Sequence, residues 1–169
     1  DGTKEYIAGG DEYTLNAGLI INNQPKIGVI GVPKKDRIFY SYGKNNSFLL
    51  ENNKINKLKC KKQTHKDEVI ALTNHTNPPK IILDKLKEFG VTSFRKLSSS
   101  YKYCVIATGE YDLYADKVRA MEWDDAAGHA IAESAGAIVT SLENKPFKYG
   151  KENYKNPTIL IRRSEKLNV

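Results

Sequence analysis

The chain has 169 residues, with 27 lysine or arginine and 20 aspartate or glutamate residues, so its formal net charge at pH 7 is +7. This length is enough for one domain with a buried core. No apolar run reaches the roughly 18 residues that a membrane-spanning helix needs, so we expect no transmembrane segment. Cys60 and Cys104 lie far apart in unlike contexts, which favours free thiols and a cytoplasmic protein.

A net positive charge suits an anionic ligand, although it says more about encounter rates than about identity. The densest basic run, residues 54–62, alternates lysine with other side chains and predicts a strand whose lysines face water at a sheet edge. Aromatic side chains do not interleave with these lysines, as a surface for stacking bases would require. We therefore expect no nucleic acid polymer among the partners.

The first part of the chain, residues 1–64, is expected to form an antiparallel sheet. Short β-rich runs alternate with turn residues between residues 12 and 60. The predicted strands cover residues 13–21, 26–32, 38–42, 48–50 and 55–60.

The second part, residues 65–169, alternates strand and helix patterns. Strands are predicted at 69–72, 91–97, 111–114 and 137–140, and helices at 78–90, 99–108 and 124–136. Asp124 or Asp125 is expected to cap the last helix, and Gly136 to end it. Together the two parts predict an α/β protein of layered α+β type, with the antiparallel half first and a smaller α/β half after it.

Two motifs carry the chemistry: Asp1-Gly2-Thr3 and the run Trp123-Asp124-Asp125-Ala-Ala-Gly. Each places a carboxylate beside small residues, which suits a hard divalent cation and a phosphate that approaches the backbone closely. The simpler interpretation of Asp124 is that it only satisfies backbone donors at a helix start.

These motifs resemble those of the lithium-sensitive, magnesium-dependent phosphatases, a superfamily that includes inositol monophosphatases and bisphosphate nucleotidases. The resemblance implies their sugar phosphatase fold and Mg²⁺ as cofactor. It also implies Asp1 and Asp124 as metal ligands in contact with substrate, Asp1 and Thr3 as catalytic residues, and Gly2 and Thr3 as further contacts to the phosphate. Gly2 would let backbone N–H groups approach the phosphate, and the Thr3 hydroxyl would orient a water.

In that superfamily the first motif reads Asp-Pro-x-Asp-Gly-Thr, and this sequence begins at the second aspartate. We therefore expect a missing N-terminal segment, which by resemblance carries two helices, a Glu-Glu metal motif and the first aspartate. Its loss predicts that this chain alone is poorly active.

The substrate is indicated by two further segments. Residues 98–104 resemble the nucleotidase segment in which a serine and a lysine three residues later, here Ser99 and Lys102, hold a nucleotide phosphate. Residues 71–75 resemble the strand end whose histidine, here His75, lies by the nucleotide; a loop histidine with a polar partner is the alternative. The resemblance thus implies a 3'(2'),5'-bisphosphate nucleotidase, which converts adenosine 3',5'-bisphosphate to AMP and phosphate.

One departure leaves the substrate open. Asp116 stands where this branch usually has an arginine for the second phosphate, so Lys117 or Arg119 would have to substitute. The alternatives are an inositol or sugar monophosphatase of the same superfamily, and a non-catalytic remnant or basic binding module. We expect Asp125 to face solvent and His129 to be structural.

Overall fold

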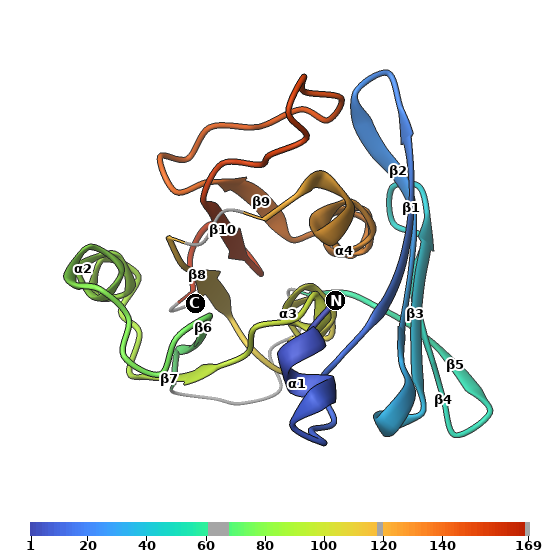
Figure 1. Ribbon diagram of the computed structural model, residues 1–169, viewed down its shortest axis with the longest axis horizontal. Coiled ribbons are helices and arrows are strands. Elements are labelled where there is room, and N and C mark those ends of the chain that lie inside the picture. The colour runs from blue at the N-terminus through green and yellow to red at the C-terminus, as the bar shows by residue number, and fades with distance from the viewer. Residues whose placement is uncertain (61–67, 118–119, 168–169) are drawn as a thin grey trace.

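The computed structural model describes residues 1–60, 68–117 and 120–167. Within these ranges the chain forms two five-stranded sheets, and the helices α3 (Tyr101–Ala107) and α4 (Glu122–Ser134) lie between them (Figure 1). The layered α/β architecture predicted from the sequence is therefore confirmed.

The first sheet is an antiparallel meander in which each strand pairs with the next along the chain. Asparagine pairs form two of its hairpin turns: Asn22 and Asn23 have φ of 51° and 61°, and Asn52 and Asn53 have φ of 50° and 58°. Asparagine tolerates this left-handed conformation better than other non-glycine residues. The strands are β1 (Leu15–Ile21), β2 (Gln24–Val32), β3 (Arg37–Tyr42), β4 (Ser47–Glu51) and β5 (Lys54–Lys57), with the short helix η1 (Pro33–Lys35) between β2 and β3.

The last of these strands is shorter than predicted. β5 ends at Lys57, and Leu58 and Cys60 beyond it turn into the core. The remaining predicted lysines, Lys61 and Lys62, lie outside the described residues.

Alternating residues give the first sheet two unlike faces. The inner face buries Ile30, Phe39 and Leu49 against the helices. The opposite face, which we call the outer face, presents apolar side chains that remain 39–67% exposed: Leu15, Leu19, Ile27, Val29, Ile38, Tyr42 and Ile55.

The second sheet is mixed, with the strand order β7-β6-β8-β10-β9. Strand β6 runs parallel to its neighbours β7 and β8, whereas β10 runs antiparallel to both β8 and β9. The strands are β6 (Ile70–Thr73), β7 (Ser93–Lys96), β8 (Leu113–Ala115), β9 (Ile138–Ser141) and β10 (Ile159–Arg162). The sequence patterns did not predict β10.

Helix α2 (Lys80–Glu88) covers the side of this sheet away from α3 and α4 (Figure 1). Its Ile82 and Leu86 pack with Leu113 and Leu160, as the helical spacing of its apolar residues predicted. Gly90, at φ 68°, follows the end of the helix. Among the helices of the described residues, none is long and apolar enough to span a membrane.

Helix α4 lies so close to the first sheet that only glycine fits beneath it. A Cβ on Gly28 would lie 2.2 Å from the Ala127 carbonyl oxygen, and a Cβ on Gly18 would lie 2.9 Å from the Ala127 nitrogen. The backbone of α4 therefore rests directly on β1 and β2, and its Ala127, Ala130 and Ile131 are buried as predicted.

The two sheets share one core. The expected boundary between residues 64 and 65 falls outside the described residues. On either side of it, Phe39 from the first sheet and Leu72 from the second belong to the same cluster of buried side chains. Cys60 and Cys104 are both buried in this cluster, and no disulfide joins these two described residues.

Candidate active site

A cavity of about 150 Å³ opens where the N-terminus, α3, α4 and the second sheet meet. It brings together three of the predicted site residues, Asp1, Lys102 and Asp124, from distant parts of the chain. The lining residues are Asp1, Asn74, Ser98, Lys102, Tyr114, Ala120, Asp124, Asp125 and Ile159.

Asp1 is held by hydrogen bonds to both of its carboxylate oxygens. The Gly2 N–H donates to Oδ1 at 2.7 Å, and the Ser100 hydroxyl lies 2.7 Å from Oδ2. Gly2 has a φ of 85° and precedes α1 (Thr3–Ile7). A Cβ at Gly2 would lie 3.1 Å from the Tyr13 Cα, so both the turn and the packing require glycine here.

Asp124 does not cap α4, so that prediction is wrong. The helix begins at Glu122, and its N-cap is Met121 in extended conformation. Met121 forms an isolated antiparallel bridge with Lys155, and the Tyr154 carbonyl accepts the Glu122 N–H at 2.8 Å, which starts the helix two residues early. Asp124 instead reaches back from the third helical position, and its Oδ2 accepts the Met121 N–H at 3.0 Å.

Asp125 does not face solvent, so that prediction is also wrong. Its side chain is fully buried and accepts the Tyr103 hydroxyl at 3.0 Å and the Asn156 amide at 2.8 Å. Asp125 faces α3, on the same side of α4 as Gly128, where an added Cβ would lie 2.3 Å from the Tyr103 ring. Burial raises the pKa of the Asp125 carboxyl, against the opposing effect of the Lys102 ammonium.

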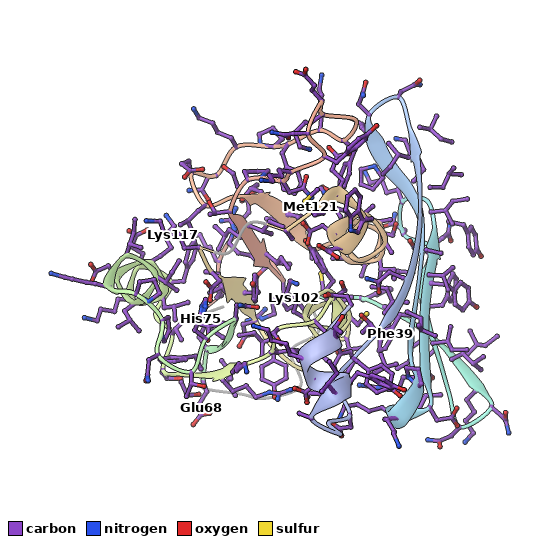
Figure 2. All side chains as sticks on the ribbon, viewed as in Figure 1. Phe39, Glu68, His75, Lys102, Lys117 and Met121 are labelled. Atoms are coloured by element: carbon purple, nitrogen blue, oxygen red, sulfur yellow. The ribbon has the colours of Figure 1, made fainter. Side chains whose placement is uncertain are left out.

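Lys102 is buried in the middle of the molecule, between the two sheets (Figure 2). Its Nζ donates to the Ser99 carbonyl at 3.3 Å and lies 5.3 and 5.2 Å from the ring centroids of Tyr103 and Tyr114. Burial lowers the pKa of this ammonium, while the carboxylates of Asp125 and Asp124 act to raise it. The cavity thus has a cationic group beside its carboxylates.

The other predicted contacts do not line this cavity. The Ser99 hydroxyl donates to the Glu12 carbonyl and accepts the Tyr101 N–H at 3.3 Å. Thr3 lies exposed at the first position of α1, next to Asp1. The His75 side chain is 52% exposed, and its Nδ1 lies 3.3 Å from the Asp116 carboxylate.

Asp116 is buried immediately after the end of β8. Its carboxylate accepts the backbone N–H groups of Asn74 and Lys117, each at 2.6 Å. These donors offset its negative charge and hold Asn74 at the cavity. Arg119, one of the two residues expected to substitute for the missing arginine, lies outside the described residues.

Sequence reasoning missed Asn74 as a site residue. Its position immediately after β6 could have indicated a role in binding, because ligands of open α/β sheets bind at the carboxyl ends of parallel strands. His129, in contrast, is structural as predicted: it is buried in α4, with Nδ1 2.9 Å from the Tyr149 hydroxyl.

The residues present suit a hard cation in type. In the described ranges no three His, Cys, Asp or Glu side chains gather into a metal-binding group. The carboxylates of Asp1 and Asp124 and the amide of Asn74 nevertheless line one cavity, and an oxygen-only donor set suits Mg²⁺. Mg²⁺ is commonly held by one or two carboxylates, with water and substrate phosphate completing its coordination. The cavity therefore fits such an ion.

Comparison with known proteins places this site in a family. A family profile described as "Inositol monophosphatase family" matches residues 1–167. The chain belongs to this family. The resemblance drawn from the Asp1 and Asp124 motifs is thereby confirmed.

The curated relatives of this family member include nucleotidases. It is 33% identical over 158 residues to the "3'(2'),5'-bisphosphate nucleotidase CysQ" of Escherichia coli strain K12, and 34% identical to that of Shigella flexneri. The match covers 93% of this chain and 63% of each relative, so the chain spans a little under two thirds of their length.

Solved structures show the same relationship. CysQ from Bacteroides thetaiotaomicron, described as a bacterial member of the inositol monophosphatase family, is 32% identical with a TM-score of 0.82. The similarity covers 98% of this chain and 68% of that one. An inositol monophosphatase from Anabaena, with a TM-score of 0.77, 22% identity and coverage of 97% and 64%, shares the fold.

Proposed function

We propose that this chain forms part of a magnesium-dependent phosphomonoesterase that converts adenosine 3',5'-bisphosphate to AMP and phosphate. The observation that carries the proposal is the buried Lys102 ammonium, which shares one cavity with the carboxylates of Asp1 and Asp124. The relatives named as 3'(2'),5'-bisphosphate nucleotidases support the same substrate class.

The charges of the cavity suit two phosphate groups. The two carboxylates would hold Mg²⁺, which would draw the scissile phosphate toward Asp1 and Asp124. The Lys102 ammonium is buried beside the carboxylates of Asp125 and Asp124, and a second phosphate would supply a further anionic partner. A sugar monophosphate has no such second group. This difference favours a bisphosphorylated nucleoside.

The reaction is the hydrolysis of one phosphate ester. When bound, Mg²⁺ would polarise the phosphate and lower the pKa of a coordinated water. In our proposal the Thr3 hydroxyl, beside Asp1, orients the water that forms the new bond to phosphorus. The bond from phosphorus to the 3' oxygen breaks, and that oxygen takes up a proton. Gly2 would let the phosphate approach the turn, and the exposed His75 would contact the nucleotide. Ser99 is buried and its hydroxyl donates to the Glu12 carbonyl, so it is not proposed as a contact.

The test is substrate preference in the protein encoded by the full reading frame. Phosphate release in the presence of Mg²⁺ is compared for adenosine 3',5'-bisphosphate and inositol monophosphate. We expect Lys102→Ala to weaken the bisphosphate by about 1.5–3 kcal/mol, or about 10- to 150-fold, the usual size of a hydrogen bond to a charged group. Lys26→Ala, which removes an exposed lysine that does not line the cavity, serves as the charge-matched control.

The same assay judges the second candidate, an inositol or sugar monophosphatase. The buried Asp116 favours this candidate, because it occupies the position where a nucleotidase arginine was expected. A parent enzyme that prefers inositol monophosphate would establish it. An equal loss on both substrates in Lys102→Ala would assign Lys102 to the fold instead.

A further inference from the structure

The hydroxyl of Ser100 joins both carboxylate-bearing segments of the site. Ser100 is fully buried, and its Oγ lies 2.7 Å from Asp1 Oδ2 and 2.6 Å from the Asp124 carbonyl oxygen. The Asn16 amide on β1 donates to the same Oγ at 2.9 Å. These contacts cross 99, 24 and 84 residues of sequence, so they depend entirely on the tertiary fold.

Among the described residues, two acceptors lie within hydrogen-bond distance of this hydroxyl. A serine hydroxyl carries one proton and can also accept hydrogen bonds. If the Asn16 amide were reversed, its oxygen would add a third acceptor around that single proton. With Asn16 as donor, the proton of Ser100 can go to the Asp1 carboxylate, where charge strengthens the bond, or to the Asp124 carbonyl.

We propose that Ser100 is a positioning residue that sets Asp1 relative to Asp124 for cation binding, and that Asn16 orients its hydroxyl. The inference rests on the proposed function, in which Asp1 and Asp124 are the metal ligands. Without Ser100, the Asp1 carboxylate would keep, among the described residues, the hydrogen bond from the Gly2 N–H at Oδ1. Its other oxygen and the start of α4 would lose their shared partner.

A matched variant separates this role from simple support of the fold. Ser47 on β4 is also fully buried, and its hydroxyl donates to the Ile131 carbonyl of the same helix at 3.0 Å. Ser100→Ala and Ser47→Ala therefore each remove one buried serine hydrogen bond to a carbonyl of α4. Only Ser100 also contacts Asp1.

The experiment measures cation binding without turnover. Mn²⁺, which protein sites generally bind more tightly than Mg²⁺, is titrated into each protein while the signal of the free ion is followed by electron paramagnetic resonance, and Mg²⁺ is added as competitor. We expect Ser100→Ala to weaken Mn²⁺ binding about 10- to 100-fold, the usual effect of removing a group that orients a metal ligand. Ser47→Ala should keep the parent affinity, while urea unfolding without metal shows similar stability losses for both.

Asn16→Ala gives a second measurement in case Ser100→Ala does not fold. It keeps the Ser100 hydroxyl but removes the donor that orients it, and we expect weaker Mn²⁺ binding by severalfold. Equal Mn²⁺ affinity in the parent, Ser100→Ala and Asn16→Ala would overturn the inference and leave the proposed function standing. A parent that binds neither ion would overturn the metal ligands of the proposed function, and this inference with them.

Discussion

Gly28→Ala is expected to destabilise the protein severely, because the added methyl group has no room. A Cβ there would lie 2.2 Å from the Ala127 carbonyl oxygen, whereas ordinary contact begins at 3.4 Å. The obstacle is the backbone of α4, which cannot rotate away as a side chain would. Helix and sheet must therefore separate by about 1.2 Å, which would also shift Asp124 on the same helix.

The size of the effect follows from this displacement. Inserting one methyl group into a well-packed core typically costs about 1–3 kcal/mol, occasionally more. Because the clash is with backbone and loosens the contact between α4 and two strands, we expect about 3 kcal/mol or more. A small protein has only about 5–15 kcal/mol of stability to lose.

Gly31→Ala is the matched control in the same strand. A Cβ at Gly31 would meet no atom within 4 Å, and neither glycine has a positive φ. Its effect should lie between zero and a stabilisation of about 1 kcal/mol, since alanine restricts the unfolded chain. Urea unfolding followed by circular dichroism measures both variants. If Gly28→Ala lost less than 1 kcal/mol relative to Gly31→Ala, the close packing of α4 on β2 would be wrong.

Three further predictions concern the site and its surroundings. Asp124→Asn should weaken Mn²⁺ binding more than about 10-fold and change the free energy of unfolding by less than about 1 kcal/mol. The reason is that asparagine can still accept the Met121 N–H but offers the metal no charge. Unchanged affinity in the same titration would remove Asp124 from the ligands. Burial alone would raise the pKa of Glu122, but the Lys151 ammonium and the N–H groups of Gly150 and Lys151 lower it below 4.5. The ionised Glu122 therefore stabilises the folded protein above pH 4.5, and this stabilisation is lost as the pH falls through the lowered pKa. Urea unfolding from pH 6 to pH 2 should therefore be less pH-dependent in Glu122→Gln, and parallel curves would contradict this. Finally, the 169-residue chain should release phosphate from adenosine 3',5'-bisphosphate more slowly than about 1 s⁻¹. Of the three carboxylates that line its described cavity, Asp125 is bonded to Tyr103 and Asn156, which leaves Asp1 and Asp124 for an ion that dehydrates reluctantly. A faster rate with Mg²⁺ would show that these two ligands suffice.

The sequence predicts features of the fold that local patterns encode. Alternating strands and the Asn22-Asn23 turn indicate the first sheet, and the spacing of Ile82 and Leu86 indicates α2. The apolar run of β10 follows the turn residues Asn156 and Pro157 and was missed. Its insertion between β8 and β9, in contrast, is a tertiary pairing that no local pattern encodes.

In the site, too, local motifs predict some residues, whereas others depend on tertiary contacts. The motifs identify Asp1 and Asp124 as candidates, and the structure places both at one cavity. The burial of Asp125 depends on Tyr103 and Asn156, which lie 22 and 31 residues away along the chain. Ser100 enters the network only through partners distant in sequence, which no local pattern contains.

The outer face of the first sheet affects how this chain behaves in water. Contiguous apolar patches of more than a few hundred Å² are uncommon on monomeric proteins and promote association. Because side chains alternate along a strand, the two faces of β3 respond in opposite ways to the same change. Lysine in place of Ile38, which is 43% exposed, would improve solubility and leave the core intact, whereas lysine at the neighbouring Phe39, which is fully buried, would place an unpaired charge against the helices.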